Sequence, residues 1–192
     1  MKLYMNDDEL VAKINAGDQN AFRQLFEQYQ HLVFNTSYRM SGSQEEAEDI
    51  TQDVFVKIFH AIINFRGDSK LSSWIYRITI NTCLKRERRK KLANWISLDI
   101  LFQQEDKFQP QSPDKSPDQQ IEISEKEQIV QQAIASLSER QRTALILFRY
   151  ENLSYREIAT VMEISLSAVE SLLHRAKDNL AQKLIPLKKY LS

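Results

Sequence analysis

The sequence predicts an all-α protein, with two small helical domains joined by a flexible acidic linker. Glycine and proline are scarce, with three and four among 192 residues, whereas residues that favour helices are plentiful. Apolar residues recur at three- and four-residue steps in two long stretches, the period of an amphipathic helix. The stretch between them holds three of the prolines among Gln, Ser and Asp, as linkers do. We predict a first domain over residues 1–93, a linker over 94–123 and a second domain over 124–192.

Two long helices open the first domain. Asp18 can cap a helix whose apolar period continues until Ser41 and Gly42 stop it. Ser43 and Glu46 then match a capping box at the start of the next helix. The predicted buried stripe of that second helix is Ala47, Ile50, Val54, Phe55, Ile58, Phe59 and Ile62. Each helix therefore has one apolar face, and we expect the two to pack together.

A turn and a third helix complete the first domain. Residues 64–69 (NFRGDS) interrupt the period with a glycine and turn formers. The third helix is predicted to run through Trp74 and Ile78 into a basic run that ends at Lys91.

Charge is segregated along this domain although the whole chain has a formal net charge of zero. Residues 65–91 contain nine cationic and two acidic side chains, whereas residues 45–59 contain five acidic side chains and one lysine. Such opposite segments indicate two different partners, and the cationic one next to an aromatic loop favours a nucleic acid.

The second domain ends in a predicted helix-turn-helix. One helical stripe precedes Ser138, which can cap the following helix together with Gln141. Ser154 and Glu157 then bracket a short helix, residues 163–165 form a turn, and a longer amphipathic helix follows. The longer helix is lined by Val169, Leu172, Leu173, Ala176, Leu180 and Leu184. The second helix of such a motif can lie in a DNA major groove.

Several classes of protein are excluded or disfavoured. With Cys83 alone, no internal disulfide and no CxxC-type metal site can form. The start of the chain lacks a signal-peptide core and no apolar run is long enough to cross a bilayer, so we expect a cytoplasmic protein. His31, His60 and His174 are scattered, and no phosphate-cradling loop or metal cluster is present. We therefore expect no enzyme, no cofactor and no small-molecule substrate.

Three motifs, in order along the chain, resemble those of the extracytoplasmic-function (ECF) sigma factors of the sigma-70 family. Residues 46–55 resemble the polymerase-binding helix of that family. Residues 65–69 and 74–78 with Asn81 resemble its melting loop and minus-ten-reading helix. Residues 153–159 resemble the first helix of its promoter-binding helix-turn-helix. The resemblance covers nearly the whole chain, and the order and spacing of the motifs make it specific.

The resemblance implies a function for each part. The first domain would be sigma region 2 and the second sigma region 4. The chain would bind core RNA polymerase and direct promoter-specific initiation by reading minus-thirty-five duplex DNA and capturing melted minus-ten bases. Relatives are commonly restrained by an anti-sigma factor, often membrane-anchored, so an anti-sigma factor is a further expected partner.

The resemblance implies that the acidic helix docks on the clamp helices of the largest polymerase subunit, and its charge supports docking onto a basic surface. The expected contact residues are Asp49, Gln52, Asp53 and Val56. The alternative is an acidic face that is merely solvated.

Promoter opening needs a pocket for an unstacked base, because unstacking costs a few kcal/mol whereas stacking on an aromatic ring returns about 1–3 kcal/mol. By resemblance, Phe65 and its loop form this pocket with Asn81. The expected minus-ten residues are Phe65, Arg66, Arg77, Asn81, Lys85 and Arg86, the cations among them holding phosphates. Alternatively Phe65 is a core residue, Asn81 an ordinary exposed side chain and the basic run a solvated tail. Trp74 is assigned mainly to structure.

The recognition helix would read minus-thirty-five DNA. Its expected contact residues are Ser167, Glu170, Ser171, His174 and Arg175. Many members of the family carry arginines where this chain has Glu170 and Leu172, so their guanine-reading pattern does not transfer. Glu170 could accept from a cytosine amino group or orient an arginine, and His174 could be a surface residue without a role.

The start of the linker is more apolar than a flexible linker without binding partners would be. Trp95, Ile96, Leu98, Ile100, Leu101 and Phe102 are predicted to dock on polymerase or on a regulator. A solvated tether is the alternative. By resemblance, the linker would thread near the polymerase active centre or the RNA exit path, where its acidic residues could imitate nucleic acid.

Two rival functions have the same helical composition. A DNA-binding regulator of the response-regulator type also ends in a helix-turn-helix, but it needs no melting loop. A helical protein that only binds another protein would fail to direct initiation with core polymerase.

Overall fold

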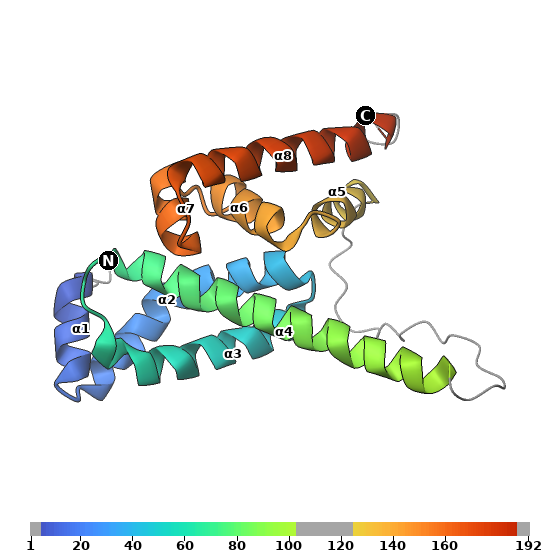
Figure 1. Ribbon diagram of the computed structural model, residues 1–192. Coiled ribbons are helices and arrows are strands. Elements are labelled where there is room, and N and C mark those ends of the chain that lie inside the picture. The colour runs from blue at the N-terminus through green and yellow to red at the C-terminus, as the bar shows by residue number, and fades with distance from the viewer. Residues whose placement is uncertain (1–4, 103–124, 188–192) are drawn as a thin grey trace.

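The computed structural model describes residues 5–102 and 125–187, and every regular element in them is helical, which confirms the all-α prediction. The elements are α1 (Asp7–Asn15), α2 (Gln19–Ser41), α3 (Gln44–Ala61), η1 (Ile62–Asn64), α4 (Leu71–Phe102), α5 (Glu125–Ala135), α6 (Glu139–Arg149), α7 (Tyr155–Met162), α8 (Leu166–Leu184) and η2 (Ile185–Leu187), as Figure 1 shows. No helix of the described residues is long and apolar enough to cross a membrane.

Helices α2, α3 and α4 pack against one another to form the first bundle. The Asp18 carboxylate accepts from two backbone N–H groups at the start of α2, as predicted. Gly42 ends this helix in the left-handed conformation (φ 73°), which glycine adopts without steric cost. Val33, Ile50 and Ile75, one from each helix, are almost fully buried where the three meet.

The structure adds one helix and lengthens another. Helix α1 was not predicted: the Asn6 side chain caps it by accepting from the backbone N–H of Glu9, and Leu10 is fully buried. Helix α4 continues past Lys91 to Phe102, so it enters the segment predicted as the linker. No glycine or proline interrupts this stretch, so the backbone can remain helical. Most of the predicted linker, residues 103–123, lies outside the described residues.

Helices α5 to α8 form the second unit. Ser154 and Glu157 make the predicted capping box at the start of α7, each side chain accepting from the backbone N–H of the other residue. Glu163 adopts a left-handed conformation (φ 54°) and turns the chain, and Ser165 caps α8. Ile158 and Val169 are fully buried between the two helices, which confirms the helix-turn-helix.

The second unit lies on the first. Helix α6 contacts α2 and α7 contacts α4, while α8 packs on α5, α6 and α7 and forms the outer layer (Figure 1). The buried apolar residues of both units form one continuous cluster. At its edge the Arg39 guanidinium lies over the Tyr150 ring, 4.0 Å from the centroid.

Candidate nucleic-acid and polymerase interfaces

One face of α3 gathers the predicted polymerase contacts. Asp49, Gln52, Asp53 and Val56 are all exposed. Gln52, Asp53 and Val56 lie three, four and seven residues after Asp49, so all four share one side of the helix. The opposite side holds the buried residues of the stripe, which fixes the rotation of α3. We call these four residues the α3 face.

The α3 face continues into apolar residues that sequence analysis assigned wrongly or missed. Phe59 was predicted to be buried, but its side chain is 58% exposed, and Ile63 is 69% exposed. The Phe59 ring makes edge-on contacts with Phe22 and His60, with centroids 5.1 Å and 5.5 Å apart. Next to its acidic residues the α3 face therefore continues as an exposed apolar strip, formed by Val56, Phe59 and Ile63. Such a strip is typical of a protein-binding surface.

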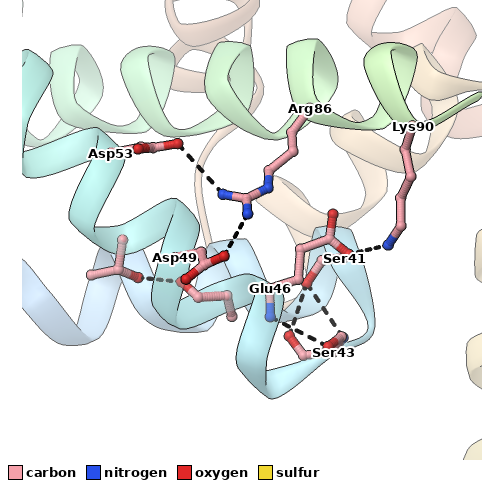
Figure 2. Close-up of polar contacts among 9 residues, drawn as sticks. Ser41, Ser43, Glu46, Asp49, Asp53, Arg86 and Lys90 are labelled. Atoms are coloured by element: carbon pink, nitrogen blue, oxygen red, sulfur yellow. Dashed lines mark hydrogen bonds and ion pairs between the residues drawn. The ribbon is translucent and has the colours of Figure 1, made fainter. Parts of the chain in front are cut away.

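The acidic face of α3 is engaged by cations of α4, as Figure 2 shows. Nη2 of Arg86 lies 2.5 Å from Oδ2 of Asp49, and its Nη1 lies 3.5 Å from Oδ2 of Asp53. One turn further along α4, Nζ of Lys90 lies 2.8 Å from Oε2 of Glu46. The two oppositely charged segments of the sequence therefore meet each other in the free chain.

The loop before α4 presents the predicted minus-ten residues unequally. The Phe65 ring is half-buried against Trp74, with centroids 5.4 Å apart, and both rings pack against the core. Trp74 thus has the structural role assigned to it. Arg66 is exposed, and Gly67 holds the turn at a φ of 78°, where a side chain would be strained.

On α4, three predicted minus-ten residues follow at four-residue steps. Arg77, Asn81 and Lys85 therefore form a stripe along one side of the helix. Asn81 and Lys85 are exposed, whereas Arg77 is half-buried. We call these residues the α4 stripe. Arg86 lies beside the stripe but is turned toward α3.

The start of α4 is covered by the second unit. Three glutamates lie in or next to α7. Glu151 precedes the helix, Glu157 lies in its first turn and Glu163 follows its last residue. We call them the carboxylate trio. The contacts are Lys70 Nζ to Glu157 Oε1 at 2.7 Å, Arg77 Nη1 to Glu163 Oε1 at 2.6 Å and the Tyr76 hydroxyl to Glu151 Oε2 at 2.9 Å. Sequence reasoning missed the trio, because its partners are distant in the chain.

These contacts move the pKa values of the groups involved. The hydrogen bond from Lys70, followed by those from the backbone N–H and hydroxyl of Ser154, lowers the pKa of Glu157 to about 2. The same contact raises the pKa of Lys70. Burial, together with the charge of Glu151, raises the pKa of the Tyr76 hydroxyl, which therefore remains a donor.

The recognition helix α8 presents all of its predicted contact residues to solvent. Ser167, Glu170, Ser171, His174 and Arg175 are exposed. Leu172 is half-buried and packs against the core, so at this position the chain contributes packing rather than a DNA contact. Nδ1 of His174 lies 2.9 Å from Oδ2 of Asp178, one turn along the helix. The Ser171 hydroxyl donates to the carbonyl of Ser167.

Among residues 5–102 and 125–187, no group of three or more His, Cys, Asp or Glu side chains could hold a metal ion. The Cys83 thiol is buried, and burial raises its pKa to about 12.

Two family models match most of the chain. Residues 25–92 match the family model of sigma-70 region 2, and residues 127–180 match that of sigma-70 region 4. The chain is 37% identical over 185 residues to the RNA polymerase sigma-H factor of Pseudomonas aeruginosa, covering 94% of this chain and 95% of that one. It is 33% identical over 193 residues to the ECF RNA polymerase sigma-E factor of Escherichia coli K12, covering 97% and 98%.

A solved structure shares the fold. The sigma factor RpoE of Bartonella quintana, solved in complex with the anti-sigma factor NepR, superposes with a TM-score of 0.64 at 21% identity, covering 85% of this chain and 96% of that one. The chain belongs to the ECF group of the sigma-70 family. Its function is promoter-specific initiation of transcription by RNA polymerase.

Proposed function

We propose that the chain directs initiation through three surfaces. The α3 face binds core RNA polymerase, and the α4 stripe with the Phe65 loop captures melted minus-ten bases. Helix α8 binds the minus-thirty-five duplex. The observation that carries this assignment is the exposure of α3 and α8 on different sides of the molecule. Separate surfaces allow polymerase and duplex DNA to be held at once. No step in this function makes or breaks a covalent bond, so the chain acts as a binding factor and not as an enzyme.

The α3 face fits a basic polymerase surface with an apolar patch beside it. Asp49 and Asp53 supply negative charge, and Val56 with the exposed Phe59 supplies apolar area. Charged rims steer association, and buried apolar anchors provide most of the binding free energy. Phe59 therefore joins the four residues predicted from the sequence.

The Phe65 loop fits an extruded base because it joins an aromatic ring to a helix, α4, that carries an exposed amide and exposed cations. Phe65 offers a ring face for stacking, Asn81 an amide for a base edge, and Lys85 with Arg66 charge for phosphates. Strand opening then draws its free energy from binding, without nucleotide hydrolysis.

Recognition of the minus-thirty-five duplex would use short polar side chains and one carboxylate. Ser167 and Ser171 can contact either base type, and Glu170 can accept from a cytosine amino group. The exposed Arg175 can contact a phosphate or a guanine. This pattern predicts a site unlike that of relatives that read guanines with arginines.

Two further partners follow. We expect an anti-sigma factor that covers polymerase-facing surfaces, as RpoE of Bartonella quintana binds NepR. We also expect the apolar start of the predicted linker to dock on polymerase or on that regulator, because the side chain of Trp95 is 69% exposed in the C-terminal part of α4. The site of action would be the cytoplasm, where polymerase and chromosome are found.

The test is to overproduce the chain in its own bacterium and to map transcript starts across the genome. The proposal predicts new starts that share one minus-ten and one minus-thirty-five element. Asp53→Lys should abolish them, whereas Asp8→Lys, the same charge change at an exposed position of α1, should not. New starts without any shared element, or full activity of Asp53→Lys, would contradict the proposal.

A further inference from the structure

A cavity lies where the two helical units meet. Its volume is about 370 Å³, within the range of about 300–1,000 Å³ that is typical of small-molecule sites. The first unit lines it with the C-terminal end of α2, the N-terminal half of α3 and the middle of α4. The second unit lines it with the end of α5 and with α6. Neither unit alone therefore contains the whole site.

The inner wall of the cavity is apolar. Each of the five helices contributes one buried apolar side chain to it, namely Met40, Ile50, Cys83, Ile134 and Ile146. Cys83 belongs with the apolar residues because burial raises the pKa of its thiol, which stays protonated. A hydrocarbon chain or ring in this space would be removed from water, which favours its binding.

The lining also carries five charged side chains, three cationic and two acidic. Nζ of Lys90 lies 2.8 Å from Oε2 of Glu46 (Figure 2), and the Arg142 guanidinium is paired with Glu87. The third cation, Arg39, has no carboxylate partner among the residues that the structure describes. Because Arg39 is exposed, it marks the side on which the cavity opens to solvent. The lining thus holds one positive charge that its two carboxylates leave unbalanced.

Arg142 adds a hydrogen-bond donor without an acceptor. Its side chain is only 8% exposed, and one terminal nitrogen donates to Glu87. The other lies 3.5 Å from the carbonyl oxygen of Ala135, a long contact, and the buried Nε has no partner within the described part of the chain. A buried donor left unsatisfied costs free energy. A small rotation of the guanidinium, which gives up the long contact with Ala135, would let an acceptor in the cavity bind Nε.

These features select a ligand by its charge. The unsatisfied donor and the unbalanced cation favour an acceptor that carries negative charge, because charge-assisted hydrogen bonds are the stronger ones. A phosphate monoester carries about 1.5–2 negative charges at pH 7, and the carboxylates of Glu46 and Glu87 in the lining would repel it. A carboxylate carries one negative charge, which matches the single unbalanced cation.

We propose that this cavity binds a small amphipathic carboxylate. The carboxylate of this organic acid accepts from Arg142, and Arg39 balances its charge. Its hydrocarbon part lies against Met40, Ile50 and Ile146.

The site is separate from the surfaces assigned to initiation. No residue of the α3 face or the α4 stripe, and none of the predicted contact residues of α8, is among the described residues that line the cavity. The inference therefore goes beyond the proposed function and does not depend on it. Because the ligand contacts both units, it stabilises the contact between them. Its concentration is then coupled to every step that moves one unit relative to the other.

The experiment uses decanoate as the probe and decanol as its uncharged counterpart of equal chain length. Each is titrated into the full chain, isotope-labelled for NMR, at concentrations at which decanoate forms no micelles. Dissociation constants come from the shifts of the backbone amide signals, and the signals that move locate the site. Thermal unfolding at increasing decanoate concentration gives an independent readout, because a ligand that binds only the folded chain raises the melting temperature.

Two variants with matched controls test the cavity and its charge. Ala135→Trp places a bulky side chain at the cavity from an exposed position, so the buried core is not disturbed. Its control, Ala181→Trp, makes the same change at an exposed position of α8 outside the lining. Arg39→Gln removes the unbalanced cation, and its control, Arg23→Gln, removes the same charge from another exposed position of α2. The amide spectrum of each variant shows whether it is folded.

We expect decanoate to bind at least about tenfold more tightly than decanol, to shift the amide signals of Gly42 and Gln132 in the lining, and to raise the melting temperature. Ala135→Trp should abolish binding. Arg39→Gln should weaken it by up to about fivefold, as for an exposed charge. The two controls should keep the affinity of the wild type, and so should Arg39→Lys, which keeps the charge.

Three results would overturn the proposal. The first is no binding of decanoate, or equal affinity for decanoate and decanol. The second is unchanged binding in a folded Ala135→Trp. The third is a set of signal changes confined to surfaces away from the lining. None of these measurements involves polymerase or promoter DNA, so a failure of this site and a failure of the proposed function are distinguishable.

Discussion

Arg86 of α4 donates to Asp49 of α3, with 2.5 Å between Nη2 and Oδ2 (Figure 2). The first residue is assigned to promoter DNA and the second to polymerase, so each proposed surface neutralises the other in the free chain. A basic polymerase surface that binds Asp49 would compete with Arg86 and release the guanidinium toward DNA. Polymerase binding and DNA binding are then coupled through one ion pair.

The coupling predicts opposite effects of removing each partner. Asp49→Asn should weaken binding to core polymerase, by up to about fivefold for an exposed charge. Arg86→Gln removes the internal competitor, so it should bind core as tightly as the wild type or more tightly, while promoter affinity of the holoenzyme falls. Fluorescence anisotropy of the labelled chain with core polymerase, followed by promoter binding, measures both. Equal weakening of core binding by both variants contradicts the coupling.

A second prediction concerns the base pocket. Phe65→Leu keeps an apolar side chain against Trp74 but removes the stacking face, so polymerase affinity and folding should be retained. Strand opening, measured by permanganate reactivity of promoter thymines, should fall about tenfold, as expected from a stacking contribution of about 1–3 kcal/mol. Asn81→Ala should do the same.

This prediction would be contradicted if Phe65→Leu and Asn81→Ala weakened binding to core polymerase as much as they weakened strand opening. Such a result would show that Phe65 and Asn81 support the bundle and do not hold a base. Thermal unfolding of the isolated chain separates the two cases, because a structural role for Phe65 lowers the melting temperature of Phe65→Leu.

A third prediction distinguishes specific from general contacts on α8. Ser171→Ala and Glu170→Ala should each reduce affinity for the cognate minus-thirty-five duplex, by about 1–3 kcal/mol for a lost base contact, and leave affinity for unrelated duplex unchanged. Arg175→Ala should weaken both duplexes equally if it contacts a phosphate, and should lower the salt dependence of binding. Binding titrations at several salt concentrations measure these effects. Unchanged discrimination in Glu170→Ala would remove Glu170 from base reading.

The low pKa of Glu157 predicts an acid-sensitive helix-turn-helix. Its carboxylate is charged in the folded state down to a pKa of about 2, against an ordinary value of 4.5, mainly through Lys70 and then Ser154. A depressed pKa contributes stability that is present above the ordinary value and is lost as pH falls toward the folded one. The free energy of unfolding should therefore decrease between pH 4.5 and pH 2.

Circular dichroism during denaturant titration at several pH values measures this decrease. Glu157→Gln should be less stable than the wild type at pH 7, and the difference should shrink near pH 2. Lys70→Gln should remove part of the effect but keep the part due to Ser154. Parallel pH profiles for the wild type and Glu157→Gln would contradict this role of the carboxylate.

Much of the fold could be predicted because its signals are local. The caps at Asp18 and Ser154 and the stop at Gly42 each act on backbone groups within a few residues. The period of apolar residues predicted which side of α3 and of α8 faces the core, and therefore that their contact residues are exposed. The nine-residue α1 was missed although Asn6 and Glu9 have the spacing typical of a helix start, because its apolar period is short.

What could not be predicted depends on tertiary contacts. Phe59 lies at the edge of the apolar stripe of α3, where the period cannot decide between a buried and an exposed side chain. The carboxylate trio is a stronger example, since Lys70 and Glu157 lie 87 residues apart in the chain and no local rule links them. The pairing of Arg86 with Asp49 is likewise absent from any local pattern, although the opposite charges of their segments were visible.

The central claim is that this chain makes core RNA polymerase specific for promoters through the α3 face and the Phe65 loop. Run-off transcription from a promoter found by start mapping, with purified core polymerase and the full chain, tests it most directly. We expect transcripts with the wild type and none with Asp53→Lys. Phe65→Leu should give a reduced yield, and a template whose minus-ten element is already melted should restore the yield. Transcription that is absent with the wild type, or undiminished in both variants, would contradict it.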